Sequence, residues 1–599
     1  MQKYSSRKDV PEKYKWNLKD FFKSEKEFEE SLDRCKKLVK DLKNYVGCTK
    51  DAHKLYEFLN KEIEAIALWE DLYVYAYLIN DQELGNEKSI KRKNKAEQLN
   101  LELEMNLSFF APELLKLSKE DYDKLYKEEE KLLEYKSDLD RIYRDKDHTL
   151  TENEEQIISS LVNSMNHFDD ISSTMLNTLH DYGTVKIDNE EITIATNNYR
   201  HLMKNENKNI RKDVREKFNK VIDQYSASNA MLLSSYVSMN DTIARIRHFD
   251  SSWEQNMFHS NLDSKIFRTL VNTVEKNLGS LQKYYKLKKE ALNLKELTSD
   301  DLALEMAKSK EEYEIEQAQK IVLEAIKPLG NEYIEKFKKI FDNNYIDYCQ
   351  YKGKCSGGYS FSTINNNSRI LMSYNGSLDS ISTIAHEGGH NVHHQFVKEN
   401  NPMQYRNTPS ITAEVASLTN ECLLSSYLAE NGKTKEERLA GIANILEVIV
   451  SNLFGAVREG KMEEEMYDEV HNGGVLTKEY LDKLSYDSLS KYYGDTVKYD
   501  DKIKNGWVNR SHYYMNFYLY SYAISISVAS YIANKILSGD KDILDKYIKF
   551  LKVGSDKWPT ETFKVLGIDL NKEETYKNAI EYFDKLIDKY YEIKNGGEK

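Results

Sequence analysis

Cysteine, proline and glycine are scarce in this sequence. Its 599 residues include 5 Cys, 6 Pro and 24 Gly. Few helix breakers in so long a chain favour long helices over many short strands. The five cysteines are odd in number and contain no Cys-x-x-Cys pair. They therefore indicate unpaired thiols in a reducing compartment rather than a disulfide framework.

The sequence also lacks an excess of positive charge and any long uninterrupted apolar run. Acidic residues outnumber basic ones by 99 to 86 and are interleaved with them, so we expect no nucleic-acid partner. The most apolar stretches, 439–457 and 517–533, contain polar breaks and are expected to be buried core helices rather than membrane spans. The opening MQKYSSRKDVPEKYKWNLKDFF has no apolar core typical of a secretory signal. We therefore expect a cytoplasmic protein without a membrane partner.

Helical periodicity dominates the chain, with apolar residues recurring three and four apart. Two regions of the sequence lack this helical periodicity. The segment 183–196 alternates apolar and polar residues about Asp-Asn, which predicts a hairpin. The segments CSGGYSFS, from Cys355, and RILMSYNG, from Arg369, predict short strands. The expected fold is mainly α, with one small sheet next to residue 380.

One segment, ISTIAHEGGHNVHHQF, carries the pattern HExxH over His386, Glu387, Gly388, Gly389 and His390. Residues four apart on a helix share one face, so two imidazoles can reach one zinc ion. The glutamate between them can take a proton from a metal-bound water. This composition would produce the pattern by chance fewer than about 0.05 times. Each glycine costs about 1 kcal/mol in a helix, which indicates close approach by another backbone or by substrate.

A third ligand is needed, because catalytic zinc usually has three protein ligands and one water. His393 and His394 follow on the same helix, but a further turn would carry a ring away from a tetrahedral site. The next expected helix, TPSITAEVASLTNECLLSSYLAENG, offers Glu414 and Glu421 two turns apart on one face. One can bind zinc while the other holds a ligand imidazole. The residues favour Glu414 as the ligand but leave the exchanged roles open.

Taken together, the ordered segments resemble oligoendopeptidase F, in the thimet oligopeptidase-like (M3) family of zinc metallopeptidases. They span nearly the whole chain: YKWNLKDFF, KCSGGYSFS, ILMSYNGSLDSISTIAHEGGHNVHH, AEVASLTNE, LTKEYLDKL, SHYYMNFYLYSYA and VGSDKWPTETFKVLGIDL. The resemblance implies one Zn2+ per chain, held by His386, His390 and Glu414. It also implies that Glu387 is the general base and that Glu421 is a carboxylate that holds a zinc-binding histidine without binding zinc itself.

The same resemblance implies two helical lobes around a deep substrate channel, with the small sheet beside the zinc helix. Helical periodicity resumes at Asn198, after the predicted hairpin, so we expect an N-terminal helical region, 1–197, that includes the hairpin, and a catalytic zinc peptidase domain, 198–599. The implied activity is that of a zinc metalloendopeptidase. Such an enzyme hydrolyses internal peptide bonds of short unstructured oligopeptides, with water activated by zinc and Glu387.

A cluster of His512 and several tyrosines follows near residue 520. Taken alone, an aromatic stripe is typical of core packing. The family's pattern has a His followed by tyrosines that donate hydrogen bonds to the oxyanion of the tetrahedral intermediate. By resemblance, His512 and Tyr520 take this role, and Tyr513 and Tyr514 are further candidates.

The sequence departs from the family's usual residues at Gly388, Asn391, His394 and 508–511, which bears on substrate preference rather than on the ligands. Two alternatives stay open. A metallocarboxypeptidase would need a charged group such as Arg510 to capture a free C-terminus. A helical binding protein could keep a zinc site without turnover, although structural zinc sites tend to close with four protein ligands and no base.

Overall fold

The structure is a computed structural model that is 71% helical and contains only small sheets. The prediction of a mainly α chain is therefore confirmed. The described residues are 4–596, except 152–153, 156, 159–160, 162–166, 178–179 and 310.

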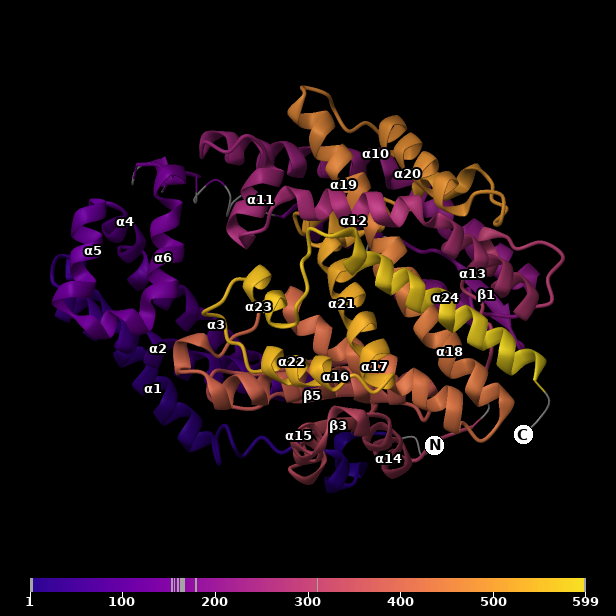
Figure 1. Cartoon of the computed structure of the whole chain (residues 1–599), viewed down its shortest axis with the longest axis horizontal. Helices are drawn as coiled ribbons and strands as arrows, with labels where there is room; N and C mark the ends of the chain where they lie inside the picture. Colours follow the sequence, from indigo (N-terminus) through magenta and orange to yellow (C-terminus); the bar gives the residue numbers. More distant parts are fainter. Residues whose placement is uncertain are drawn as a thin grey trace. The chain divides into compact units, whose positions relative to one another are not determined.

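The chain forms two compact units, each assembled from three separate stretches of sequence. Figure 1 labels the helices and strands and colours them along the sequence. Unit 1 comprises Met1–Thr149, Glu311–Tyr427 and Ile532–Gly567, and unit 2 comprises Leu150–Lys310, Leu428–Tyr531 and Ile568–Lys599. The predicted boundary between residues 197 and 198 lies within unit 2. Compact units follow contacts whereas the predicted regions follow sequence, so that division stays a prediction.

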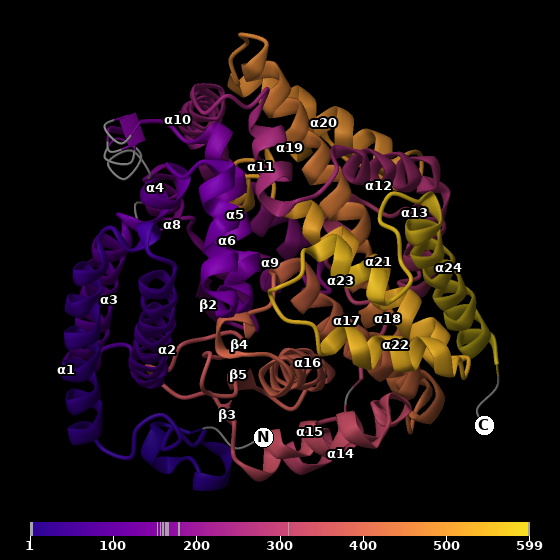
Figure 2. The same ribbon diagram turned by 60° about the vertical axis from the view of Figure 1, so that its left-hand side comes forward.

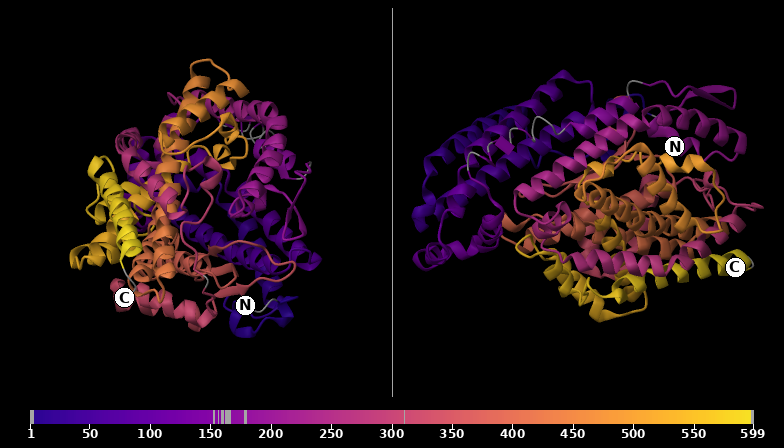
Figure 3. Two further views of the ribbon diagram at one scale, coloured as in Figure 1. Left: turned by 90° about the vertical axis from the view of Figure 1, so that its right-hand side faces the viewer. Right: turned by 90° about the horizontal axis from the view of Figure 1, so that it is seen from above.

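The N-terminal stretch of unit 1 is a helical layer. Its first three long helices, in indigo and violet, lie side by side in Figure 2 and in the right view of Figure 3. Ser24 caps the first of them by accepting the N–H of Glu27, and Asp51 caps the second. The helices of this layer are α1 (Glu25–Leu42), α2 (Ala52–Gln82), α3 (Glu87–Leu107), α4 (Phe110–Leu115), α5 (Lys119–Glu128) and α6 (Lys136–Arg144).

A three-stranded sheet lies in the same unit, with strand order β3-β5-β4. The strands are β3 (Ile346–Cys349), β4 (Tyr359–Phe361) and β5 (Arg369–Tyr374). β3 is parallel to β5, and β4 is antiparallel to it. The buried ammonium of Lys354 donates to the carbonyls of Asp347, Cys349 and Met372, which ties β3 to β5. The sequence predicted β4 and β5 but not β3.

Helix α16 packs against β4 and β5 and is contacted by α14, α15, α17 and α22 of the remaining helices of unit 1 (Figure 2). The expectation of a small sheet beside this helix is therefore confirmed. The helices are α14 (Ile315–Ala325), α15 (Asn331–Asp342), α16 (Leu378–Asn400), α17 (Ser410–Asn431, of which residues to 427 belong to unit 1), α22 (Lys541–Leu551) and α23 (Pro559–Val565).

Unit 2 contains the predicted hairpin, formed by antiparallel β1 (Thr184–Ile187) and β2 (Glu190–Thr193). Its turn residues Asp188 and Asn189 both have positive φ, 48° and 68°, as a tight two-residue hairpin turn requires. The helices of this unit are α8 (Phe168–Asn177), α9 (Thr196–Leu202), α10 (Lys208–Ile246), α11 (Ser252–Ser260), α12 (Ser264–Lys276), α13 (Leu278–Ala291), α18 (Lys435–Ile449), α19 (Ala456–His471), α20 (Lys478–Tyr493), α21 (Leu519–Leu537, to residue 531) and α24 (Glu573–Asn595).

The two most apolar stretches are core helices, as predicted. The first lies in α18, a π-helical turn at Val450–Gly455 and the start of α19, which form one continuous helix, Lys435–His471. By length and composition this helix could cross a membrane, but 61% of its most apolar window is buried inside the structure. The second lies in α21, where Ala523, Ile524 and Ile526 are fully buried.

Candidate metal centre

Helix α16 carries the HExxH residues in unit 1. It begins after Ser377, whose hydroxyl accepts the N–H of Ser380. From there the helix runs unbroken to Asn400, so His386 and His390 lie one turn apart on one face, as predicted. The imidazole centroids are 5.0 Å apart.

The two glycines of the motif are sites of close approach, as their cost in a helix predicted. A Cβ added to Gly389 would lie 2.7 Å from the Cα of Ser417 in α17, which is a backbone contact. A Cβ added to Gly388 would lie 2.2 Å from the ring of Phe337 in α15. Gly389 therefore lets the backbones of α16 and α17 touch. Asn420 of α17 adds a hydrogen bond of 2.9 Å to the carbonyl of Ala385.

This contact brings Glu414 of α17 opposite the two histidines. Its Oε2 lies 3.6 Å from His386 Nε2 and 3.8 Å from His390 Nε2. One potential ligand atom from each of the three residues lies within 4.8 Å of the others. These distances are too long for hydrogen bonds. A tetrahedral zinc with bonds of about 2.0–2.1 Å places its ligand atoms about 3.3 Å apart, so the donor set and its spacing fit zinc.

Glu421, the other carboxylate left open by the sequence, lies behind the triad. Its Oε1 lies 2.6 Å from His386 Nδ1, and its Oε2 accepts a hydrogen bond of 3.0 Å from Ser382. A proton held at Nδ1 leaves the lone pair of Nε2 facing Glu414, which is the orientation a metal ligand needs. Of the two carboxylates, Glu414 therefore has the geometry of a ligand and Glu421 that of a group that orients a ligand.

Burial and the neighbouring charges set the electrostatics of Glu387. Its side chain is buried, and burial raises its pKa to about 7, against the lowering effect of His386 and with a further rise from Glu414 and Glu421. A carboxyl group of this kind can both accept and release a proton near neutral pH. A divalent cation held by the triad would add positive charge nearby and lower this pKa.

The two ligand histidines are shifted in opposite directions. Burial lowers the pKa of His386, but its hydrogen bond to Glu421 and the nearby carboxylates outweigh burial and raise it to about 9. Burial and the charge of His386 lower the pKa of His390 well below its ordinary value. The carboxylates around the two histidines thus favour one positive charge at this site. A metal ion can supply that charge in place of the proton on His386.

His393 and His394 are core residues rather than members of the triad. His393 is buried and stacks on Phe550, with ring centroids 5.9 Å apart. Burial lowers the pKa of His393 to about 3 and that of His394 to about 4. Both imidazoles are therefore neutral, and neither belongs to the group of potential ligands formed by His386, His390 and Glu414.

The predicted oxyanion residues belong to unit 2, where a short 3-10 helix, Ser511–Tyr514, precedes α21. Tyr513 is buried, with its hydroxyl 3.8 Å from Met462 Sδ. Tyr520 is also buried; its ring packs against Trp253, and its hydroxyl donates to Asn256 Oδ1 at 3.4 Å. Both tyrosines have the contacts of packed core side chains.

Tyr522, which the sequence analysis did not select, has its ring beside that of His512. The ring of Tyr522 is 6.1 Å from His512 and 5.3 Å from Tyr518, and all three side chains are partly exposed. Tyr514 is partly exposed too, but its ring packs on Tyr236 at 5.3 Å. The signal that could have found Tyr522 is its spacing of four residues from Tyr518, which directly precedes α21 (Leu519–Leu537).

The structure thus brings together His386, Glu387, His390 and Glu414 in unit 1. His512 and the tyrosines near it lie in unit 2. Their part in the same site stays a prediction, as does the role of Tyr520.

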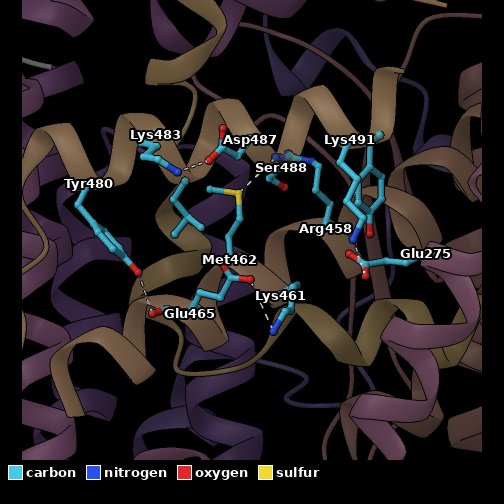
Figure 4. A pocket seen from close by; sticks show the side chains of 12 residues that line it. Glu275, Arg458, Lys461, Met462, Glu465, Tyr480, Lys483, Asp487, Ser488 and Lys491 are labelled. Atoms are coloured by element: carbon cyan, nitrogen blue, oxygen red, sulfur yellow. Dashed lines mark hydrogen bonds and ion pairs between the residues drawn. The ribbon is translucent and has the colours of Figure 1, made fainter. Parts of the chain in front are cut away.

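Unit 2 also holds a pocket of about 340 Å³ between α19 and α20 (Figure 4). Its walls carry both signs of charge. Lys491 pairs with Glu275 at 2.7 Å, and Lys483 pairs with Asp487 at 2.5 Å. Arg458 pairs with Glu459 at 2.9 Å. Because these charges are balanced locally, the pocket does not present a surface of one sign.

Comparison with known proteins gives consistent matches over the chain. The model of "Peptidase family M3" matches residues 201–582, and that of "Oligopeptidase F" matches residues 113–179. The plasmid-encoded oligoendopeptidase F of Lactococcus lactis subsp. cremoris is 30% identical over 600 residues, covering 98% of this chain and 99% of that protein. Oligopeptidase PepF of Bacillus subtilis is 29% identical over 592 residues, covering 98% and 88%. The crystal structure of oligoendopeptidase-F from Enterococcus faecium superposes with a TM-score of 0.74 at 26% identity, covering 95% and 99%.

Proposed function

Since this chain belongs to peptidase family M3, in its oligoendopeptidase F group, we propose that it is a zinc metalloendopeptidase that cuts internal bonds of short unstructured oligopeptides. The family itself makes the chain a metallopeptidase that acts on oligopeptides. The observation that carries the finer proposal is the triad. His386, His390 and Glu414 offer ligand atoms within 4.8 Å of one another, on the helix pair that also carries Glu387.

In this proposal His386, His390 and Glu414 hold one zinc ion per chain. Zinc in such a site supplies a Lewis acid and a water of lowered pKa. Glu387 accepts a proton from the attacking water at its carboxylate and passes it to the leaving amine. Its buried position supports this role, because the environment keeps the proton affinity of the carboxylate high. Glu421 keeps His386 in the tautomer that binds metal.

The developing negative charge on the peptide oxygen needs donors besides the metal. His512 is our first candidate, with Tyr520, Tyr513 and Tyr514 as the tyrosines implied by the family's pattern. The burial of Tyr513 and Tyr520 favours partly exposed donors instead. We therefore add Tyr522, whose ring lies beside His512, to the candidates. Two lobes around a channel and a cytoplasmic location are further parts of the proposal.

The carboxypeptidase alternative is weakened by the surroundings of Arg510. Its guanidinium lies 2.5 Å from Glu459, a carboxylate that also pairs with Arg458. An arginine already paired in this way is less suited to capture a free C-terminal carboxylate. The binding-protein alternative gives Glu387 no catalytic task. It is weakened because burying a carboxylate costs free energy, which a binding protein without catalysis would have no reason to spend at this position.

The proposal is tested with matched pairs of quenched fluorogenic peptides that differ only in a free or an amidated C-terminus. We expect cleavage of both, at internal bonds mapped by mass spectrometry, with loss of activity in EDTA and recovery on adding zinc. Cleavage restricted to free C-termini would indicate the carboxypeptidase. Stoichiometric zinc without any turnover would indicate the binding protein.

A further inference from the structure

The turn between the 3-10 helix Ser511–Tyr514 and α21 has an unusual backbone. Asn516 and Phe517 have φ values of 46° and 60°, in the left-handed region that residues with side chains rarely adopt. Two such residues in succession persist only where the surroundings fix them. This turn separates His512 from Tyr518 and Tyr522, so its shape decides how those rings are presented.

Three side chains of unit 2 hold the backbone of this turn. Glu463 of α19 accepts the N–H of Phe517 at 2.7 Å. Asn256 of α11 donates to the carbonyl of Asn516 at 3.1 Å, and Tyr236 of α10 donates to the carbonyl of Tyr514 at 2.8 Å. The Phe517 ring is anchored as well, since it packs between Trp253 and Tyr467 with centroids 4.8 and 4.4 Å away.

Of these three, Glu463 is the least expected residue at its position. Its side chain is 1% exposed, and its second oxygen is buried without a hydrogen-bond partner among the described residues. Burial raises its pKa to about 8, although the hydrogen bond from Phe517 opposes that rise. An apolar residue would avoid the cost of burying this carboxyl group. What an apolar residue could not do is accept the N–H of Phe517.

We propose that Glu463 is a positioning residue for the reaction: by holding the Phe517 N–H it fixes the left-handed turn, and through the turn it fixes His512, Tyr518 and Tyr522. This inference rests on the proposed function, in which His512 and Tyr522 assist peptide cleavage. Without the acceptor, the buried N–H of Phe517 would be unsatisfied, and the turn could relax toward ordinary φ values.

The test compares Glu463→Gln with Glu463→Met in the full-length chain. Glutamine keeps an oxygen that can accept the Phe517 N–H, whereas methionine fills the same space without an acceptor. The matched control is Glu464→Met, in the next residue of α19. Glu464 is also buried, but its carboxylate pairs with Lys461 at 2.7 Å and Arg268 at 3.2 Å rather than with the turn.

Each variant is measured for zinc content, melting temperature, kcat, KM and hydrogen exchange of the peptide covering 512–520. We expect Glu463→Met to bind zinc normally, to exchange the Phe517 amide at least about tenfold faster, and to lose about ten- to a hundredfold in kcat with little change in KM. Glu463→Gln should stay close to wild type in zinc content, kcat, KM and amide exchange, and its melting temperature should not fall. Tyr236→Phe removes the hydrogen bond to the Tyr514 carbonyl of the same turn, so it should change amide exchange and kcat in the same direction as Glu463→Met, by smaller factors.

Two results would overturn the inference. One is wild-type kcat and amide protection in Glu463→Met. The other is an equal loss of kcat in Glu464→Met, which would mean that any buried change in α19 disturbs activity. A wild-type chain that cleaves no peptide in a metal-dependent way would refute the proposed function instead. In that case the exchange data would still decide whether Glu463 holds the turn.

Discussion

Replacing Gly389 with alanine would place a methyl group where α16 and α17 touch. The added Cβ would lie 2.7 Å from the Cα of Ser417 and 2.9 Å from the carbonyl oxygen of Ala416. Ordinary van der Waals contact begins at 3.4 Å, so the backbone of α17 would have to move away by about 0.7 Å, the difference between 3.4 and 2.7. No side-chain rotation can relieve the clash, because both contacts are backbone atoms.

Such a movement reaches the metal ligand directly. Glu414 lies three residues before Ser417 on the same helix, so its carboxylate would move with the backbone. A metal site is sound when its ligand distances stay within about 0.2 Å of their ideal values, and the displacement exceeds that margin. We expect zinc affinity to fall about ten- to a hundredfold. The free energy of unfolding should fall by about 1–3 kcal/mol from overpacking.

The matched control is Gly279→Ala in α13, where an added Cβ would meet no atom within 4 Å. Relief of the glycine penalty should leave this variant unchanged or stabilise it by up to about 1 kcal/mol. Zinc affinity is measured by competition with a chelator, and unfolding by calorimetry. Wild-type zinc affinity and wild-type stability in Gly389→Ala would refute the claim that this glycine sets the spacing of the site.

Three further predictions concern single side chains. Glu387→Gln should keep its zinc and lose several orders of magnitude in kcat; activity within about tenfold of wild type would contradict the assigned base. Tyr522→Phe should lower kcat about a hundredfold at an unchanged melting temperature. Tyr520→Phe should instead lower the melting temperature and leave kcat near normal, because the contacts of Tyr520 are buried. A loss of kcat in Tyr520→Phe with normal kcat in Tyr522→Phe would contradict both expectations. The folded pKa of Glu463, about 8, lies above the ordinary 4.5, so its contribution to stability is present below about pH 4.5 and is lost as pH rises through 8. Glu463→Gln should therefore flatten the fall in unfolding free energy between about pH 5 and 8 in urea titrations, and an unaltered slope would argue against the buried proton.

The metal centre was the most predictable part of the molecule because its signals are local. The spacing of His386 and His390 follows from helix geometry, and the two glycines between them predict close packing from their cost in a helix. The sequence favours Glu414 as the ligand but does not exclude Glu421, since two turns of helix place both on one face. The packing of α17 on α16 distinguishes them, because it places Glu414 opposite both Nε2 atoms and Glu421 against His386 Nδ1.

The parts that escaped prediction depend on contacts distant in sequence. β3 is a fully buried strand of four residues, too short to show alternation, and its Ile346 pairs with Ile370 of β5, 24 residues later. The tyrosines after His512 were ranked by resemblance rather than by helix face. Tyr520 packs on Trp253 far upstream, a contact that no local pattern reveals. Local sequence patterns likewise cannot predict compact units that are each formed by three separate stretches of the chain.

The central claim is that His386, His390 and Glu414 bind a zinc ion that peptide cleavage requires. Its most direct test is the zinc content of purified wild type, Glu414→Ala and Glu421→Ala after dialysis against a weak chelator, with peptide cleavage measured on the same samples. We predict about one zinc per chain in wild type, loss of most zinc and all cleavage in Glu414→Ala, and weakened but detectable binding in Glu421→Ala. Full zinc in Glu414→Ala together with its loss in Glu421→Ala would contradict the account, because the two carboxylates would then have exchanged roles.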